Sequence, residues 1–322
     1  MTGPIAMGGH GAAMEASGPL NLTAASASFG DLALKGVTGA AALDYVQDGG
    51  TRIQLTGGLR SAGGRWPLFG PSASDDVPEL GAMKAALGDF AVDIPAFSLS
   101  TGSYGTRAVL TRPARLTPRN GGVLTVQPVA RPIYAADPGQ LGGGALKLLA
   151  TRGRGLPEAA FDIPDWRLTP AGFSARLDGR AALDFGIAQG LTVSTAGVLA
   201  TDNGVLTYVA SRCLDVAVER LELGENDVFD VAGQACPTRA PLATVRDGGW
   251  NADLALRDFA AKAPFLALDV DRIQGRAAVI GTKAGLDLSA DIASARVVDT
   301  TTPQRFNPLT GSGAIALKDE TW

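Results

Sequence analysis

The sequence predicts a mainly β protein built on one long antiparallel sheet, and three observations support this fold class. Runs of alternating apolar and polar residues recur along the 322-residue chain, and a period of two indicates strands with one apolar and one wet face. The composition, with 42 glycines and 19 prolines, is rich in turns. Asp-Gly and Asn-Gly dipeptides between the runs favour two-residue hairpins, whose central residues need positive φ. These dipeptides are Asp48-Gly49, Asn120-Gly121, Asp178-Gly179, Asn203-Gly204 and Asp247-Gly248.

Each predicted strand presents an apolar side. In residues 51–56 and again in residues 97–100, apolar residues alternate with polar ones. The runs 173–178 and 180–185 flank one dipeptide and place Arg176 and Asp184 on the polar side. An ordinary closed core explains any one apolar position as well as an open groove does. The candidate groove-lining residues are Ile53, Leu55, Phe97, Leu99, Leu177, Leu183, Phe185, Leu191, Val193, Leu206, Tyr208, Val216 and Val218.

Two segments, 74–90 and 137–150, are predicted to be short helices that cover the sheet. In the first, Leu80, Met83 and Leu87 follow helical spacing and Gly88 supplies a stop. In the second, Asp137 and Pro138 suit a helix start. The three glycines at 142–144 disfavour that second helix because glycine loses more backbone entropy.

The two cysteines flank a predicted hairpin. Cys213 precedes the run 214–223 and Cys236 follows the run 228–235, about two residues away from direct opposition. The apolar phase slips near Glu219-Arg220, and a β-bulge there would absorb part of the offset. A disulfide would indicate an oxidising compartment, whereas two unpaired buried thiols are the alternative.

Composition excludes several classes of function. The net charge is -4 with no basic stripe, so no nucleic acid partner is expected. No run of about 18 apolar residues occurs, which is the length of a membrane-spanning helix. Residues 1–20 lack Lys and Arg and therefore lack the charged start of a signal peptide. We expect a flexible or incomplete start, with residues 1–322 forming a single elongated segment of a longer protein.

Catalytic chemistry is not indicated. The single histidine, His10, lies in a glycine-rich stretch without a neighbouring acid or nucleophile, so no catalytic triad is predicted. Two cysteines and one histidine do not make the usual zinc set. We therefore expect no enzyme activity, no catalytic residues, no metal and no cofactor. A carbohydrate-active enzyme is the weakest alternative because aromatic residues are scarce, at 6%.

Three stretches resemble a known family. Residues 86–90, with the following Ile94-Pro95-Ala96-Phe97, look like the element that opens strand units in the YdbH-like proteins of bacterial envelopes. The hairpin between Cys213 and Cys236 resembles their paired-cysteine hairpin. Residues 295–299 and 304–309 are similar to another recurring stretch. The resemblance covers the chain from about Ala86 onward.

The resemblance implies a function. The YdbH, TamB and AsmA-like proteins form a long twisted β-groove that bridges the inner and outer membranes, and phospholipids are thought to pass along it. By this resemblance the chain would be a periplasmic segment of an envelope lipid-transfer protein. Its partners would be phospholipid acyl chains and components of both membranes, and its parent protein would be anchored in the inner membrane. The alternative is a structural or adhesive β-solenoid with a closed core and no lipid transport.

Overall fold

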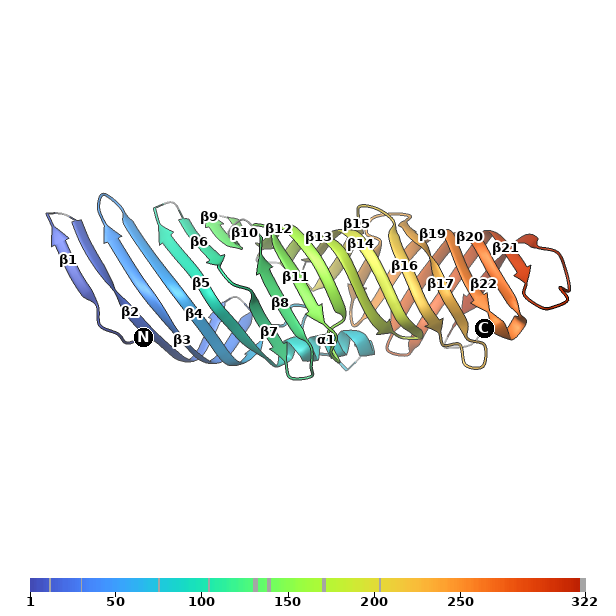
Figure 1. Ribbon diagram of the computed structural model, residues 1–322, viewed down its shortest axis with the longest axis horizontal. Coiled ribbons are helices and arrows are strands. Elements are labelled where there is room, and N and C mark those ends of the chain that lie inside the picture. The colour runs from blue at the N-terminus through green and yellow to red at the C-terminus, as the bar shows by residue number, and fades with distance from the viewer. Residues whose placement is uncertain are drawn as a thin grey trace. The chain divides into compact units, whose positions relative to one another are not determined.

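The chain folds almost entirely into antiparallel strands (Figure 1). The computed structural model describes residues 1–11, 13–29, 31–74, 76–103, 105–129, 133–137, 140–169, 172–202 and 204–318. Contacts group the chain into two compact units. The first unit is Met1–Pro71, Ala82–Leu156 and Ala160–Ala175, and the second is Ser72–Gly81, Pro157–Ala159 and Arg176–Trp322. The mainly β fold class is confirmed, whereas the single elongated segment stays a prediction.

The first unit is a sheet that divides into two branches. Strands β1 to β5 pair in chain order, and β5 then pairs with both β6 and β7. One branch continues from β6 through β9 and β10 to β12, and the other from β7 through β8 to β11. The strands are β1 (Ala6–His10), β2 (Ala13–Phe29), β3 (Leu32–Gln47), β4 (Thr51–Arg65), β5 (Phe90–Gly102), β6 (Gly105–Leu110), β7 (Ala114–Pro118), β8 (Val123–Pro128), β9 (Tyr134–Asp137), β10 (Gln140–Gly143), β11 (Leu146–Thr151) and most of β12 (Glu158–Thr169).

In the second unit, two of the strand paths are interrupted. Strand β14 pairs with β15 along one half and with β16 along the other, while β17 and β18 share β19 in the same way. Strands β19 to β22 then pair in chain order. The elements are most of β13 (Gly172–Phe185), β14 (Ala188–Asp202), β15 (Val205–Ala210), β16 (Leu214–Leu221), β17 (Val228–Pro237), β18 (Ala243–Arg246), β19 (Gly249–Ala263), the 3-10 helix η1 (Pro264–Leu266), β20 (Leu268–Thr282), β21 (Gly285–Asp299) and β22 (Leu309–Leu317).

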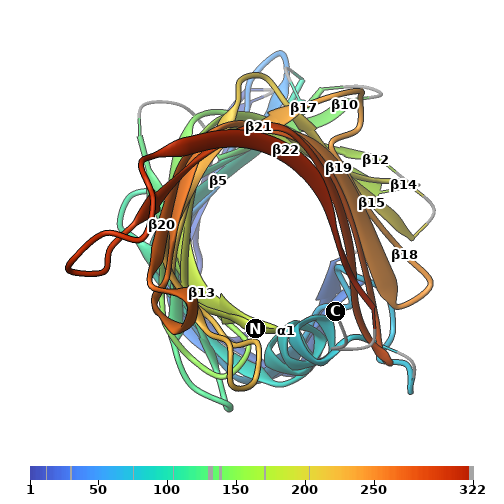
Figure 2. The same ribbon diagram turned by 90° about the vertical axis from the view of Figure 1, so that its right-hand side faces the viewer.

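A series of β-bulges bends the second unit. Asp230 in β17, Asp258 in β19 and Arg272 in β20 have φ values of 50°, 50° and 53°. The register of each of these strands shifts beside its bulge. A bulge adds a residue to one strand, bends it and increases its twist. Bulges in neighbouring strands therefore explain why the long strands of this unit curve in the end-on view (Figure 2).

The dipeptide turns are confirmed in part. Asp247 and Gly248 both have positive φ, 52° and 79°, as the predicted hairpin class requires. Asp48-Gly49 connects β3 to β4, and Asn120-Gly121 lies between β7 and β8. Asn203 falls outside the described residues.

The turn predicted at Asp178-Gly179 is wrong, because β13 runs straight through it. Leu177 and Leu183 keep one phase across the dipeptide, and Asp178 forms an ion pair with Arg212. The pairing and burial of a long strand outweigh the local turn preference.

One of the two predicted helices exists. Helix α1 (Pro78–Gly88) begins at a proline and ends at the predicted glycine. The helix predicted over 137–150 is wrong, since Gln140–Gly143 and Leu146–Thr151 are strands. A side chain at Gly143 would collide with the Ile133 carbonyl and the Trp166 ring, both 1.9 Å from its Cβ position. The strands can therefore pair this closely only because residue 143 is a glycine.

The prediction of a flexible start is also corrected, because β1 and β2 occupy residues 6–10 and 13–29.

The predicted disulfide between Cys213 and Cys236 is present, with an S–S distance of 1.98 Å. Leu214 lies opposite Ala235, and the same register continues to Leu221 opposite Val228. The cysteines are therefore in direct opposition, so the predicted offset and the predicted bulge at Glu219-Arg220 are both wrong. The bulge of this hairpin lies instead at Asp230 and faces β19.

Candidate functional site

The candidate site is the apolar face of each sheet. The predicted lining residues belong to six strands. Ile53 and Leu55 lie in β4, Phe97 and Leu99 in β5, Leu177, Leu183 and Phe185 in β13, Leu191 and Val193 in β14, Leu206 and Tyr208 in β15, and Val216 and Val218 in β16.

In the first unit, strand register brings the four predicted residues together. Leu55 lies between Leu43 of β3 and Leu99 of β5. Ile53 is two residues from Leu55 and Phe97 is two residues from Leu99, so all share one face, because successive side chains alternate across a strand. Exposed residues of β3, such as Thr38 and Asp44, occupy the opposite phase.

In the second unit, directly paired residues continue one apolar face across several strands. Val193 lies opposite Val216. Leu206 lies opposite Val245, which in turn lies opposite Trp250. Paired residues point to the same side of a sheet, so these side chains form one surface. In β13, Leu177, Leu183 and Phe185 alternate with exposed charged residues as predicted.

This surface is only partly covered. Among the thirteen predicted lining residues, Val218 alone is buried, at 7% exposure, and the other twelve are half-buried. A closed core covers aliphatic side chains almost completely. The sheet therefore keeps part of its apolar surface accessible in each unit.

Five aromatic side chains lie close to glycines of neighbouring strands. A Cβ atom added at Gly64 would come 2.4 Å from the Phe90 ring, one at Gly197 2.7 Å from the Tyr208 hydroxyl, and one at Gly281 2.0 Å from the Trp250 ring. Gly143 stands in the same relation to Trp166, and Gly233 to Phe259. Aromatic rings that cover glycines on neighbouring strands stabilise a sheet. Here each ring occupies the space that a side chain would fill at the glycine.

The apolar face of the second unit is its concave side. Strands β13, β16, β19 and β21 end at one rim, and β18 and β20 end at the other. We call these the Gly186 rim and the Gly248 rim, after the turns that follow β13 and β18. Phe185 at the first rim contacts Trp250 at the second, with ring centroids 5.3 Å apart. Because both side chains belong to the apolar face, this face must curve inward.

A polar pair interrupts the lining of the second unit. The Thr195 and Tyr208 hydroxyls form a hydrogen bond with each other, and burial raises the pKa of Tyr208. Each hydroxyl is thereby satisfied within an apolar surface. The pair adds polarity without an unpaired charge.

Charged pairs occupy the exposed phase of the strands. Arg212 pairs with Asp178 at 2.9 Å, and Lys262 pairs with Asp230 at 2.8 Å. Exposed pairs of this kind contribute little stability. They do give each sheet the wet outer face that the sequence predicts.

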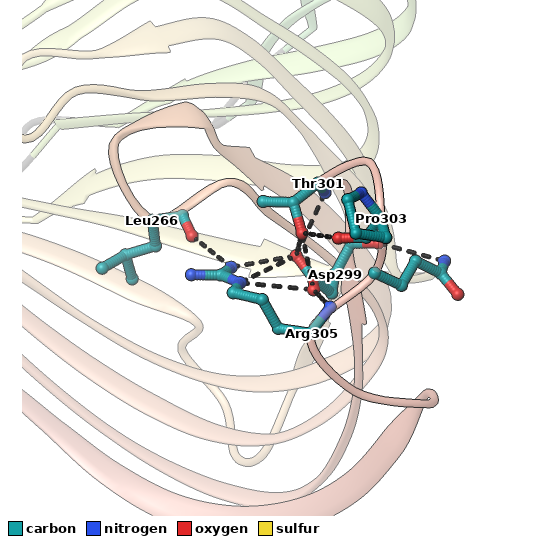
Figure 3. A network of polar contacts seen from close by, with 6 residues as sticks. Leu266, Asp299, Thr301, Pro303 and Arg305 are labelled. Carbon is teal, nitrogen blue, oxygen red and sulfur yellow. Dashed lines mark hydrogen bonds and ion pairs between the residues drawn. The ribbon is translucent and has the colours of Figure 1, made fainter.

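The most buried charge is Asp299, at the end of β21 (Figure 3). Its carboxylate accepts hydrogen bonds from the Arg305 side chain and backbone, and from the Thr301 backbone and hydroxyl. Arg305 also donates to the Leu266 carbonyl at 2.9 Å. The Arg305 guanidinium holds the pKa of Asp299 well below its usual range. Every oxygen of this carboxylate is engaged, so the cluster fixes the loop after β21 and leaves no free acceptor for a ligand.

Within the described ranges, no three His, Cys, Asp or Glu side chains come close enough to hold a metal ion. Among the same residues, no helix is both long and apolar enough to cross a membrane. No protein-family model, curated protein or solved structure matches the chain.

Sequence reasoning missed Trp250, Asp299 and the residues before α1. Trp250 follows directly after Asp247-Gly248-Gly249, and its place at a hairpin start is a usable signal. Asp299 and Arg305 lie in the stretches that carry the family resemblance, but no local pattern marks them as an ion pair. The contacts of the segment before α1 are long-range, and no local pattern marks them.

Proposed function

We propose that the chain is a lipid-transfer segment of a bacterial envelope protein, whose apolar faces hold phospholipid acyl chains. The observation that carries the proposal is the partly covered lining: twelve of thirteen predicted residues keep accessible apolar surface. Each CH₂ group that such a surface removes from water gains about 0.8 kcal/mol. Acyl chains need this burial and no specific hydrogen bond.

Three further features agree with the proposal. The lining is mostly aliphatic, and the glycines provide room for its aromatic rings. The disulfide suits an oxidising compartment such as the periplasm. The resemblance of three stretches to YdbH-like proteins points to the same group of envelope proteins.

The experiment combines mass analysis with photocrosslinking. Native mass spectrometry of the purified chain should detect phospholipid, and a benzophenone amino acid at Leu206 or Leu183 should crosslink to it. Matched outward positions, Val209 and Asp184, lie in the same strands and are exposed, so probes there should not crosslink. Absence of lipid together with silent inward probes would instead favour a structural β-solenoid.

A further inference from the structure

A short segment before and within the start of α1 connects the two rims of the second unit. We call residues 72–74 and 76–81 the strap. The Gly186 backbone N–H donates to the Glu79 carboxylate at 2.8 Å, which ties the strap to the Gly186 rim. The Val77 backbone N–H donates to the Gly248 carbonyl at 2.9 Å, and Lys283 donates to the Ser74 carbonyl. Since Gly248 and Lys283 follow β18 and β20, these two contacts lie at the opposite rim.

The strap therefore passes across the open side of the concave face. Ser74 and Glu79 are five residues apart, and an extended chain of that length reaches at most about 18 Å. Both rims must lie within reach of this span. The Phe185 and Trp250 rings, one at each rim, are also in contact. Both the strap and this pair of rings therefore connect the two rims across the apolar face.

The strap is anchored unequally. At the Gly248 rim it is held through backbone atoms of Val77, whose side chain is only 4% exposed. At the Gly186 rim, a hydrogen bond joins the Glu79 side chain of the strap to the Gly186 backbone N–H. A side chain–backbone bond at an exposed site is the easier of the two to break.

We propose that the strap and the Phe185–Trp250 pair form a gate over lateral access to the apolar face, and that the gate opens at Glu79. The ligand follows from the proposed lipid-transfer function, on which this inference rests: an acyl chain would enter sideways between the rims. Leu206 lies behind the gate, in the same row as Val245 and Trp250.

The test measures thiol accessibility without any phospholipid. The native cysteines are joined in a disulfide, so Leu206→Cys introduces one reactive thiol behind the gate. An apolar reagent, N-(1-pyrenyl)maleimide, should modify it slowly. Glu79→Ala and Phe185→Leu should each speed modification by about three- to tenfold, as expected when one hydrogen bond or one ring contact is lost.

Matched variants provide the controls. Glu79→Gln keeps the acceptor oxygen and should retain the original rate, and Glu225→Ala removes an exposed glutamate at another turn. A thiol at the outward position Val209 should react at one rate in every background. Circular dichroism confirms that each variant is folded.

The outcomes separate the two proposals. Equal rates at position 206 in all variants would overturn the gate, even if native mass spectrometry finds bound phospholipid. Faster modification in Glu79→Ala and Phe185→Leu, with no phospholipid bound, would support the gate and overturn the lipid-transfer function. Equal rates and no lipid would overturn both.

Discussion

At the scale of single residues, backbone conformation and cross-strand space determine the bends and the lining. Asp258 and Asp230 occupy the left-handed region at φ 50°, which aspartate tolerates better than branched residues. The glycines under Trp250, Tyr208 and Phe90 provide room for rings. None of these roles requires a catalytic group, which agrees with a surface that works by its shape and polarity.

Asp299 gives a prediction about pH. Its pKa in the folded protein is lowered by Arg305, so it stabilises the fold fully above the ordinary aspartate pKa of about 4. Below that value the unfolded chain binds a proton that the folded chain does not, so this stabilisation is lost progressively as the pH falls toward the lowered pKa of Asp299 in the folded protein. Asp299→Asn should therefore lower the melting temperature at pH 7, and its difference from the native protein should shrink between about pH 5 and pH 3.

Thermal unfolding followed by circular dichroism measures this difference. Asp291→Asn changes an exposed aspartate in the same strand and serves as the control. A difference for Asp299→Asn that stays constant as the pH is lowered would show that the ion cluster does not act through the ionised carboxylate.

At the scale of elements, the disulfide joins two interrupted strands at their interruptions. Cys213 lies between β15 and β16, and Cys236 lies next to the last residue of β17, just before the gap that precedes β18. The bond therefore fixes the place where both strand paths break. This is a structural role that a simple hairpin bond would not have.

Replacing both cysteines should test that role. The loop closed by the disulfide spans 23 residues in sequence, for which the chain-entropy model gives about 3 kcal/mol. Urea denaturation of Cys213→Ala/Cys236→Ala should show a free energy of unfolding lower by that amount. The native protein with reductant should behave like the variant, and equal midpoints with and without reductant would contradict the prediction.

Local patterns predict elements well where pairing and periodicity agree. The alternation around Leu177 and Leu183, helix α1 and the turn at Asp247-Gly248 were all predictable. The wrong predictions fall where a distant residue determines the structure. Trp166 occupies the space beside Gly143 and favours a strand. Arg212 pairs with Asp178, which lies within the continuous strand β13. The contacts of Glu79 and Val77 join residues more than 100 positions apart, so no local pattern reveals them.

At the scale of the whole molecule, the proposed function depends on surfaces shared by many strands. One charged side chain on such a surface should disturb lipid binding more than the same charge outside it. Leu206→Glu should lower the amount of bound phospholipid roughly tenfold, because an uncompensated carboxylate in apolar contact is unfavourable by more than a kilocalorie per mole. Val209→Glu, three residues away and on the outer face, should leave it unchanged.

Quantitative lipid extraction after purification measures this effect. Thermal stability of both variants shows whether either charge unfolds the protein. Equal lipid content in Leu206→Glu and Val209→Glu would argue against binding at the apolar face of the second unit.

The close approach of aromatic rings to glycines limits how the sequence can change. A lining position such as Val193 should accept another aliphatic residue with little effect, since its side chain is only half-buried. Gly197, Gly233 and Gly281 cannot accept even a methyl group without displacing a ring. A saturation mutagenesis scan should therefore find its strictest positions at these glycines, and a tolerant surface between them. The surface proposed to carry function would then be the part of the chain that tolerates the most substitutions.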